Sequence, residues 1–118
     1  MPDIAHNLLA AVDRKDMEQF LSFIAPDATF RFGSAPPVVG HGSIEEAVSG
    51  FFASISRLKH SLNRVVESDS ALLIEGHVTY TRHDNSEITL PFVNVLELTN
   101  DLIADYKIYI DIAPLYMG

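Results

Sequence analysis

The sequence contains no cysteine, so neither a disulfide nor a thiolate metal site can form. Basic residues are scarce: 8 Lys and Arg stand against 16 Asp and Glu, which gives a net charge of −8. Because a nucleic-acid surface needs clustered Lys and Arg, and no basic run occurs, we expect no nucleic-acid partner. No stretch approaches the roughly 18 apolar residues of a membrane-spanning helix, so no membrane partner is expected. The chain begins Met1-Pro2-Asp3 with no apolar run after it, unlike a signal peptide. Together with the absence of cysteine, which suits a reducing compartment, this predicts a cytoplasmic protein.

The residues that are present have the composition of a folded domain. Of the 118 residues, 47% are hydrophobic and 20% are charged, which is typical of a packed chain and not of a disordered one. This length is usual for one domain, so we expect a single domain over residues 1–118.

The last third of the chain predicts an antiparallel meander. Three β-rich stretches follow one another at 71–83, 87–98 and 102–112. Short turns rich in Asn, Asp and Ser separate them, and a further strand pattern at 58–67 precedes them. Asn94 interrupts an otherwise apolar strand face, and Pro91 predicts a bulge or bend in the same strand.

The first half of the chain predicts three helices and one short strand. Apolar residues recur at helical spacing in three segments, at 4–15, 17–24 and 43–55. Asp16 and Ser43 should start the second and third helices, since Gln19 and Glu46 follow each three residues later, as in a capping box. Pro26 should end the second helix. A strand is expected at 28–32 and a Gly- and Pro-rich loop at 33–42.

The predicted order is ααβαββββ, which indicates an α+β domain. Four long strands can curl around the third helix and leave an apolar pocket, the usual place for a small-molecule site. Phe51 falls at the centre of the apolar stripe of that helix.

Several stretches together resemble a known family. They are APDATFRF (25–32), VGHGSIEEAVSGFF (39–52), LKH (58–60), GHVTYTRHDNSEITLPF (76–92) and LIADYKIYIDIAPL (102–115). The chain resembles the SnoaL-like branch of the nuclear-transport-factor-2-like superfamily, which has a cone-shaped, cystatin-like fold. The resemblance implies that three helices from the first half pack in the concave face of a strongly curved, mainly antiparallel sheet. The superfamily includes polyketide cyclases, steroid isomerases, dehydratases and epoxide hydrolases, as well as members that only bind.

The resemblance transfers no complete catalytic set. The positions that the known sets would fill with an acid or a tyrosine fall at Leu8, Ala10, Phe32 and Ile108. In particular, the Asp that the dehydratase-like branch carries on its first helix would fall near Ala10 and is missing. Two positions do match: His60 resembles the first histidine of the dehydratase-like branch, and Asn94 falls near the second acid of the isomerase-like site.

His60 and Asn94 are therefore the candidate catalytic residues. His60 is in phase with Leu58 and Leu62, so its ring should face the interior, where it either exchanges a proton or serves as a buried structural histidine. Burying an unpaired amide costs on the order of 1–3 kcal/mol, so Asn94 should bond a tyrosine, His60, water or a ligand. The candidate substrate-binding residues are Tyr80, Tyr106, Phe32, Phe51, Phe92, Ile108 and Ile110. Both tyrosines fit equally well as core residues.

Two functions remain open. One is a cofactor-independent isomerase, cyclase or dehydratase that acts on a small apolar carbonyl compound, with His60 moving the proton. The other is a domain that binds a ligand or a protein without catalysis. No cofactor is expected, and the histidines lack metal-ligand spacing.

The outer face of the sheet predicts a homodimer. This face carries Val93, Val95, Thr79, Thr81, Thr89, Pro91 and Tyr109, which together are too apolar for water. Asp111 should also lie on this face, away from the pocket.

Overall fold

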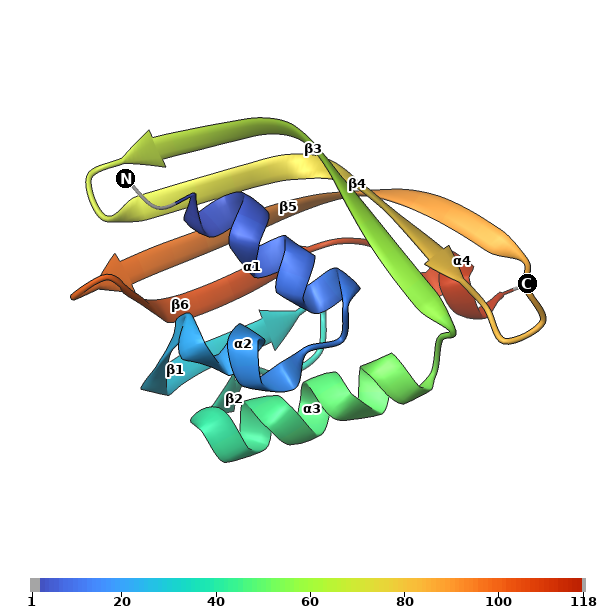
Figure 1. Ribbon diagram of the computed structural model, residues 1–118, viewed down its shortest axis with the longest axis horizontal. Coiled ribbons are helices and arrows are strands. Elements are labelled where there is room, and N and C mark those ends of the chain that lie inside the picture. Colours follow the sequence, from blue (N-terminus) through green and yellow to red (C-terminus); the bar gives the residue numbers. More distant parts are fainter. Residues whose placement is uncertain (1–2, 118) are drawn as a thin grey trace.

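The computed structural model describes residues 3–117, which form four helices and one six-stranded sheet (Figure 1). The helices are α1 (Ile4–Asp13), α2 (Met17–Ser22), α3 (His41–Ala53) and α4 (Ala113–Tyr116). The strands are β1 (Ile24–Phe32), β2 (Val38–Val39), β3 (Arg57–Ser68), β4 (Ala71–Thr81), β5 (Glu87–Thr99) and β6 (Leu102–Tyr109). Their order in the sheet is β2-β1-β6-β5-β4-β3, and only β1 and β6 pair in parallel.

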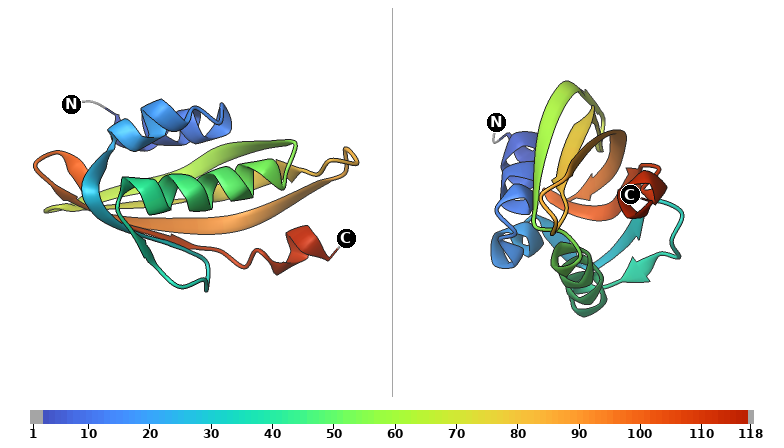
Figure 2. Two further views of the ribbon diagram at one scale, coloured as in Figure 1. Left: turned by 90° about the horizontal axis from the view of Figure 1, so that it is seen from below. Right: turned by 90° about the vertical axis from the view of Figure 1, so that its right-hand side faces the viewer.

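The sheet curls around three helices. Figure 2 shows α1, α2 and α3 on one side of the curved sheet, with the long strands β3 to β6 bending past them. The core joins Leu8 and Ile44 of the helices to Ile74, Leu96 and Ile103 of the sheet, all fully buried. The predicted α+β cone is confirmed. No helix within residues 3–117 is long and apolar enough to cross a membrane.

The meander forms as its alternating pattern predicts. Strands β3, β4, β5 and β6 pair in sequence order, and the turns between them contain residues with positive φ: Asp69, Asn85, Asn100 and Asp101. Asn and Asp tolerate that conformation better than other non-glycine residues. The short polar turns therefore set the hairpins.

Of the two alternatives expected at Pro91, a bulge or a bend, the bulge does not form. The register of β4 with β5 is unbroken there, and Pro91 pairs with His77. On its other side β5 has no partner at this point, because its pairing with β6 ends at Val93 and Tyr109. A proline lacks the N–H that such a neighbour would need, so it fits a strand that has lost one neighbour.

The irregularity lies in β3 instead, where the register shifts between Leu62 and Arg64. Gly76 faces this shift in the neighbouring strand. A Cβ atom at Gly76 would lie 2.1 Å from the Ser61 carbonyl oxygen, so β4 can approach β3 here only with glycine.

The second helix is shorter and the first strand longer than the sequence predicts. The helix ends at Ser22, and Ile24 already pairs with Ile103 of β6. Pro26 does not end a helix but lies inside β1, within the interval between Ile24 and Thr29 where the β1–β6 register shifts. That break in the ladder is where a strand tolerates proline.

The third helix begins at His41 and not at Ser43. Gly40, with φ of 90°, is the residue before the helix, and its N–H donates to the Ala28 carbonyl. The His41 ring also lies 2.7 Å, through Nε2, from the Ile24 carbonyl oxygen. These contacts to β1 fix the helix start, so the predicted capping box at Ser43 does not form.

The buried stripe of α3 consists of Ile44, Val48 and Phe52. Phe51 is only partly buried, so its predicted place at the centre of the stripe is wrong. Ile55, the last residue of the predicted helical segment, is buried but lies beyond the end of the helix at Ala53.

Two elements escaped the sequence patterns. Val38–Val39 forms β2 and pairs with β1 inside the predicted loop. The last strand ends at Tyr109, short of the expected residue 112, and α4 follows. Arg82 holds α4 in place, since its guanidinium donates to the carbonyls of Pro114 and Leu115 at 3.0 and 2.8 Å.

Candidate functional site

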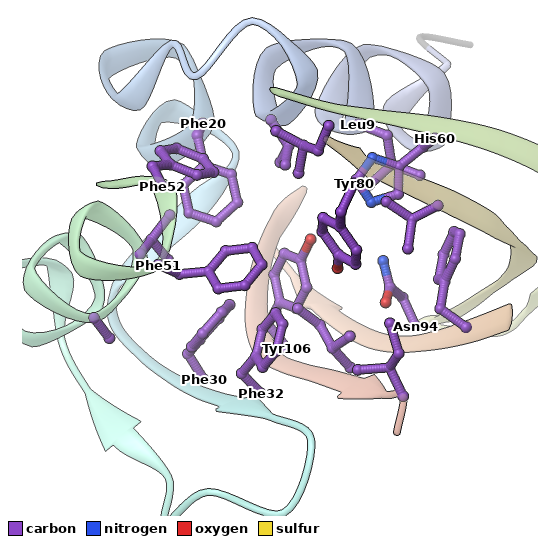
Figure 3. Close-up of a pocket in the computed structure, with 18 of the residues that line it drawn as sticks. Leu9, Phe20, Phe30, Phe32, Phe51, Phe52, His60, Tyr80, Asn94 and Tyr106 are labelled. Carbon is purple, nitrogen blue, oxygen red and sulfur yellow. The ribbon is translucent and has the colours of Figure 1, made fainter. Parts of the chain in front are cut away.

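A cavity of about 220 Å³ lies between the curved sheet and the first three helices (Figure 3). The wall contains every candidate site residue from the sequence: His60, Asn94, Tyr80, Tyr106, Phe32, Phe51, Phe92, Ile108 and Ile110. The cavity is somewhat smaller than the sites of drug-sized ligands, which span roughly 300–1,000 Å³. The core has therefore not collapsed, and the space suits a compact ligand.

The cavity has an aromatic side and a polar side. Figure 3 shows Phe20, Phe30, Phe32, Phe51 and Phe52 on one side, and His60, Tyr80 and Asn94 on the other. The rings of Phe32 and Phe51 are 4.8 Å apart, and those of Phe51 and Tyr80 are 5.5 Å apart. No lysine or arginine belongs to the cavity wall in the described part of the chain. The wall thus offers apolar contacts and a few neutral hydrogen-bonding groups, but no positively charged side chain that could bind an anionic ligand.

His60 forms a pair with an aspartate of α1. Its Nδ1 lies 2.6 Å from Oδ1 of Asp13, and its backbone N–H donates to Oδ2 of Asp13 at 3.0 Å. The side chains of His60 and Asp13 are only 10% and 23% exposed. Asp13 therefore holds both the ring and the backbone of β3 at this point.

The pairing fixes the proton on the His60 ring. An ionised carboxylate can only accept, so Nδ1 carries the hydrogen and Nε2 of the neutral ring has a free lone pair. Nε2 makes no hydrogen bond within residues 3–117. The ring of Phe92 packs edge-on against the imidazole, with centroids 5.2 Å apart. The geometry is that of an oriented base beside an apolar cavity.

Asn94 is the most unusual polar group of the core. It is 2% exposed, and its Oδ1 has no hydrogen-bond partner among the described residues. The strand partners of Asn94 are Ile74 and Ile108, both apolar. The expected bond to a tyrosine or to His60 is therefore absent from the described chain. An unpaired buried carbonyl is costly, so its presence at the cavity wall is an indication of a ligand group.

The two tyrosines at the wall keep their hydroxyl protons. Burial raises the pKa of Tyr80 and of Tyr106 well above the usual value for tyrosine. Both residues line the cavity. Each is thus a neutral donor that is available to an oxygen atom in the cavity.

Comparisons with known proteins identify the family of the chain. The model of the SnoaL-like domain family matches residues 5–106. The chain belongs to the SnoaL-like domain family. No curated protein sequence matches it.

Solved structures share this SnoaL-like fold at low sequence identity. An NTF2-like protein of unknown function from Burkholderia pseudomallei is 19% identical, with a TM-score of 0.86 over 94% of this chain and 90% of that one. TerC, co-crystallised with polyporic acid, is 16% identical, with a TM-score of 0.85 over 97% and 93%. A putative SnoaL-like polyketide cyclase from Jannaschia is 12% identical, with a TM-score of 0.84 over 97% and 87%.

Asp13 is the site residue that the sequence did not reveal in this SnoaL-like domain. The resemblance predicts an aspartate near Ala10, where none stands, but Asp13 lies three residues later, at the end of α1. Asp13 follows Leu9 of the cavity wall by four residues, so both share one helix face. The sequence signal that could have identified Asp13 is its helical spacing from Leu9, which places an acid on the buried face of the helix.

Asn94→Leu is expected to leave the free energy of unfolding unchanged or to raise it by about 1–3 kcal/mol, because it removes an unpaired polar atom from an apolar wall. Urea denaturation of the variant and the parent SnoaL-like domain measures this. Asn63→Leu is a control at an exposed position, where the amide oxygen lies 2.9 Å from His77 Nδ1. A loss above 1 kcal/mol in Asn94→Leu would mean that Asn94 has a structural partner.

Proposed function

We propose that this chain is a cofactor-independent enzyme of the isomerase, cyclase or dehydratase kind. Its substrate is a small, neutral, mostly apolar carbonyl compound that enters the cavity. The observation that carries the proposal is the His60–Asp13 pair, which leaves Nε2 unbonded at a cavity that Asn94 also lines. An imidazole oriented by a carboxylate is suited to taking a proton from carbon.

His60 is the proposed base and acid. Its Nε2 takes a proton from the carbon next to the carbonyl, and the electrons of that C–H bond move to form an enolate. The imidazolium, stabilised by Asp13, returns the proton to another atom of the substrate or to a leaving hydroxyl. A free Nε2 with a fixed ring orientation is what this step needs.

Tyr80, Tyr106 and Asn94 are the proposed partners of the substrate oxygens. The tyrosine hydroxyls would donate to the carbonyl oxygen as it becomes negative. Asn94 lines the same cavity, and its Nδ2 would donate to a second substrate oxygen. Phe32, Phe51, Phe92, Ile108 and Ile110 would bind the apolar part of the substrate.

The structural neighbours support a compound of this kind. The Jannaschia protein is described as a putative polyketide cyclase, and TerC was crystallised with polyporic acid. Both have the fold of this chain, so a cyclic carbonyl compound is a reasonable ligand to propose for the same kind of cavity.

The test is hydrogen exchange at carbon. The chain is added to 2-indanone or 2-tetralone in D₂O, and loss of the α-proton signals is followed by NMR. The proposal expects exchange faster than in buffer alone. Exchange no faster than in buffer, with both ketones bound, would overturn the catalytic proposal and leave a domain that binds without catalysis.

The homodimer is proposed to form through the outer face of the sheet. Strand register places the exposed Val66 and Leu73 in one row with Val95, and the exposed Tyr109 opposite Val93. An apolar patch of this kind favours association. Thr81 was predicted on this surface but does not belong to it, because it is buried and its hydroxyl lies 3.2 Å from Glu87.

Sedimentation velocity at micromolar concentration is expected to show a species of twice the 13.0 kDa chain mass. Leu73→Glu should restore the monomer, because it places a charge inside the patch, whereas Glu45→Lys on the exposed side of α3 should not. A single 13.0 kDa species for the unmodified chain would rule the dimer out.

A single domain over residues 1–118 and a cytoplasmic location complete the proposal.

A further inference from the structure

A second hollow lies on the outer face of the sheet. Its volume is about 590 Å³, and its wall includes Asn63, Glu75, His77, Tyr109 and Asp111. All five side chains are exposed in the single chain, and Tyr109 also belongs to the proposed dimer surface. This outer hollow is thus separate from the inner cavity that contains His60.

Two residues line both spaces. Phe92 and Ile110 belong to the wall of the inner cavity and to the wall of the outer hollow. Between the two spaces the protein is therefore only about one side chain thick.

The sheet itself is split at this point. Pairing between β5 and β6 ends at Val93 and Tyr109, after which the chain leaves the sheet toward α4. Figure 2 shows β5 and the segment before α4 diverging. Pro91 lies on the open edge of β5 and has no N–H to donate across the seam. No backbone ladder closes this gap within the described residues, so its closure depends on side chains.

We propose that Phe92 and Ile110 form a partition that limits the length of the ligand. The inference rests on the proposed function, in which the inner cavity binds a small apolar carbonyl compound. A compact ring fits in front of the partition. A ligand with a longer chain meets Phe92 and Ile110, and it gains space in the direction of the outer hollow only when the partition is opened.

Ile110 is the side chain on which the partition can be tested. Phe92 packs against His60 at 5.2 Å, so its removal would also disturb the base. Ile110 lies beyond the end of β6, pairs with no strand and is partly exposed. Ile108 supplies a matched control, because it lines the inner cavity but not the outer hollow. Ile108→Ala and Ile110→Ala remove the same atoms two positions apart.

The experiment is calorimetric titration with 4-n-alkylphenols, whose alkyl chain is lengthened one carbon at a time. Affinity for the unmodified chain should rise about fourfold per methylene while the methylenes are buried, and then fall at a cut-off length. Ile110→Ala should move that cut-off by at least two carbons and bind the first excluded phenol at least tenfold more tightly. Ile108→Ala, which enlarges the inner cavity without opening the partition, should move the cut-off by less than Ile110→Ala does.

The outcomes separate the two proposals. An equal cut-off in Ile110→Ala and the unmodified chain, or an equal shift in Ile108→Ala, would overturn the partition while ligand binding stands. Failure of every phenol to bind the unmodified chain would overturn both the ligand site and the partition. Ile110→Val keeps the test decisive if Ile110→Ala does not fold, since it should still move the cut-off by one carbon.

Discussion

His60→Gln is expected to lower the rate of α-proton exchange by roughly 10²–10⁴-fold, the usual contribution of a positioned acid or base. Glutamine retains polarity and similar length but has no lone pair that takes a proton near neutral pH. The ring of His60 is held by Asp13 at 2.6 Å, so the loss removes an oriented group and not a mobile one. The rate is measured by NMR with 2-indanone in D₂O.

Asp13→Asn separates orientation from proton transfer. The amide that replaces the Asp13 carboxylate no longer requires a hydrogen on Nδ1 of His60, and it cannot stabilise the imidazolium. The rate of α-proton exchange should therefore fall, while the affinity for the ketone stays within a few-fold. His77→Gln is the control, because His77 lies outside the cavity and pairs with Asn63. An exchange rate in His60→Gln within threefold of the unmodified chain would contradict the proposed role of the histidine.

Phe52→Ala is expected to lower the free energy of unfolding by about 3–5 kcal/mol, as large-to-small changes in a packed core do. Phe52 is 8% exposed and belongs to the buried stripe of α3. Its neighbour Phe51 is only partly buried, so Phe51→Ala removes fewer packed contacts and should cost less. Urea denaturation of both variants gives the two values.

The comparison of these two variants tests the phase of α3. A smaller cost for Phe51→Ala follows from the partial exposure of its ring. Equal losses in the two variants would show that Phe51 is as tightly packed as Phe52 and that the buried stripe includes it. Ala53→Gly, at the exposed end of the same helix, controls for the effect on helix propensity alone.

Much of the fold could be predicted because its strands alternate strictly. The parity of β4 and β5 placed Tyr80, Phe92 and Asn94 toward the interior, and the structure brings all three to one cavity. Helix phase was harder, since Phe51 and Phe52 are adjacent and both apolar. The start of α3 depends on contacts of Gly40 and His41 with β1, which no local motif contains.

The site could be predicted only in part, because its chemistry depends on contacts between distant residues. Asp13 and His60 are 47 positions apart, and only the packing of α1 on β3 brings them together. Whether Asn94 Oδ1 has a hydrogen-bond partner depends on the neighbouring strands β4 and β6 as well as on β5 itself. The gap beside Pro91, between β5 and the segment that follows β6, could not be predicted from the sequence. The alternating β pattern continues past Tyr109, whereas the pairing with β5 stops there.

The most direct test of the central claim, that the cavity is a site for a carbonyl compound, is a crystal structure with 4-ethylphenol, whose oxygen stands in for that of an enol. The ring is expected among the phenylalanines, with its oxygen within hydrogen-bond distance of Tyr80, Tyr106 or Asn94. Phenol bound only elsewhere, or a cavity that stays empty at saturating phenol, would contradict the claim.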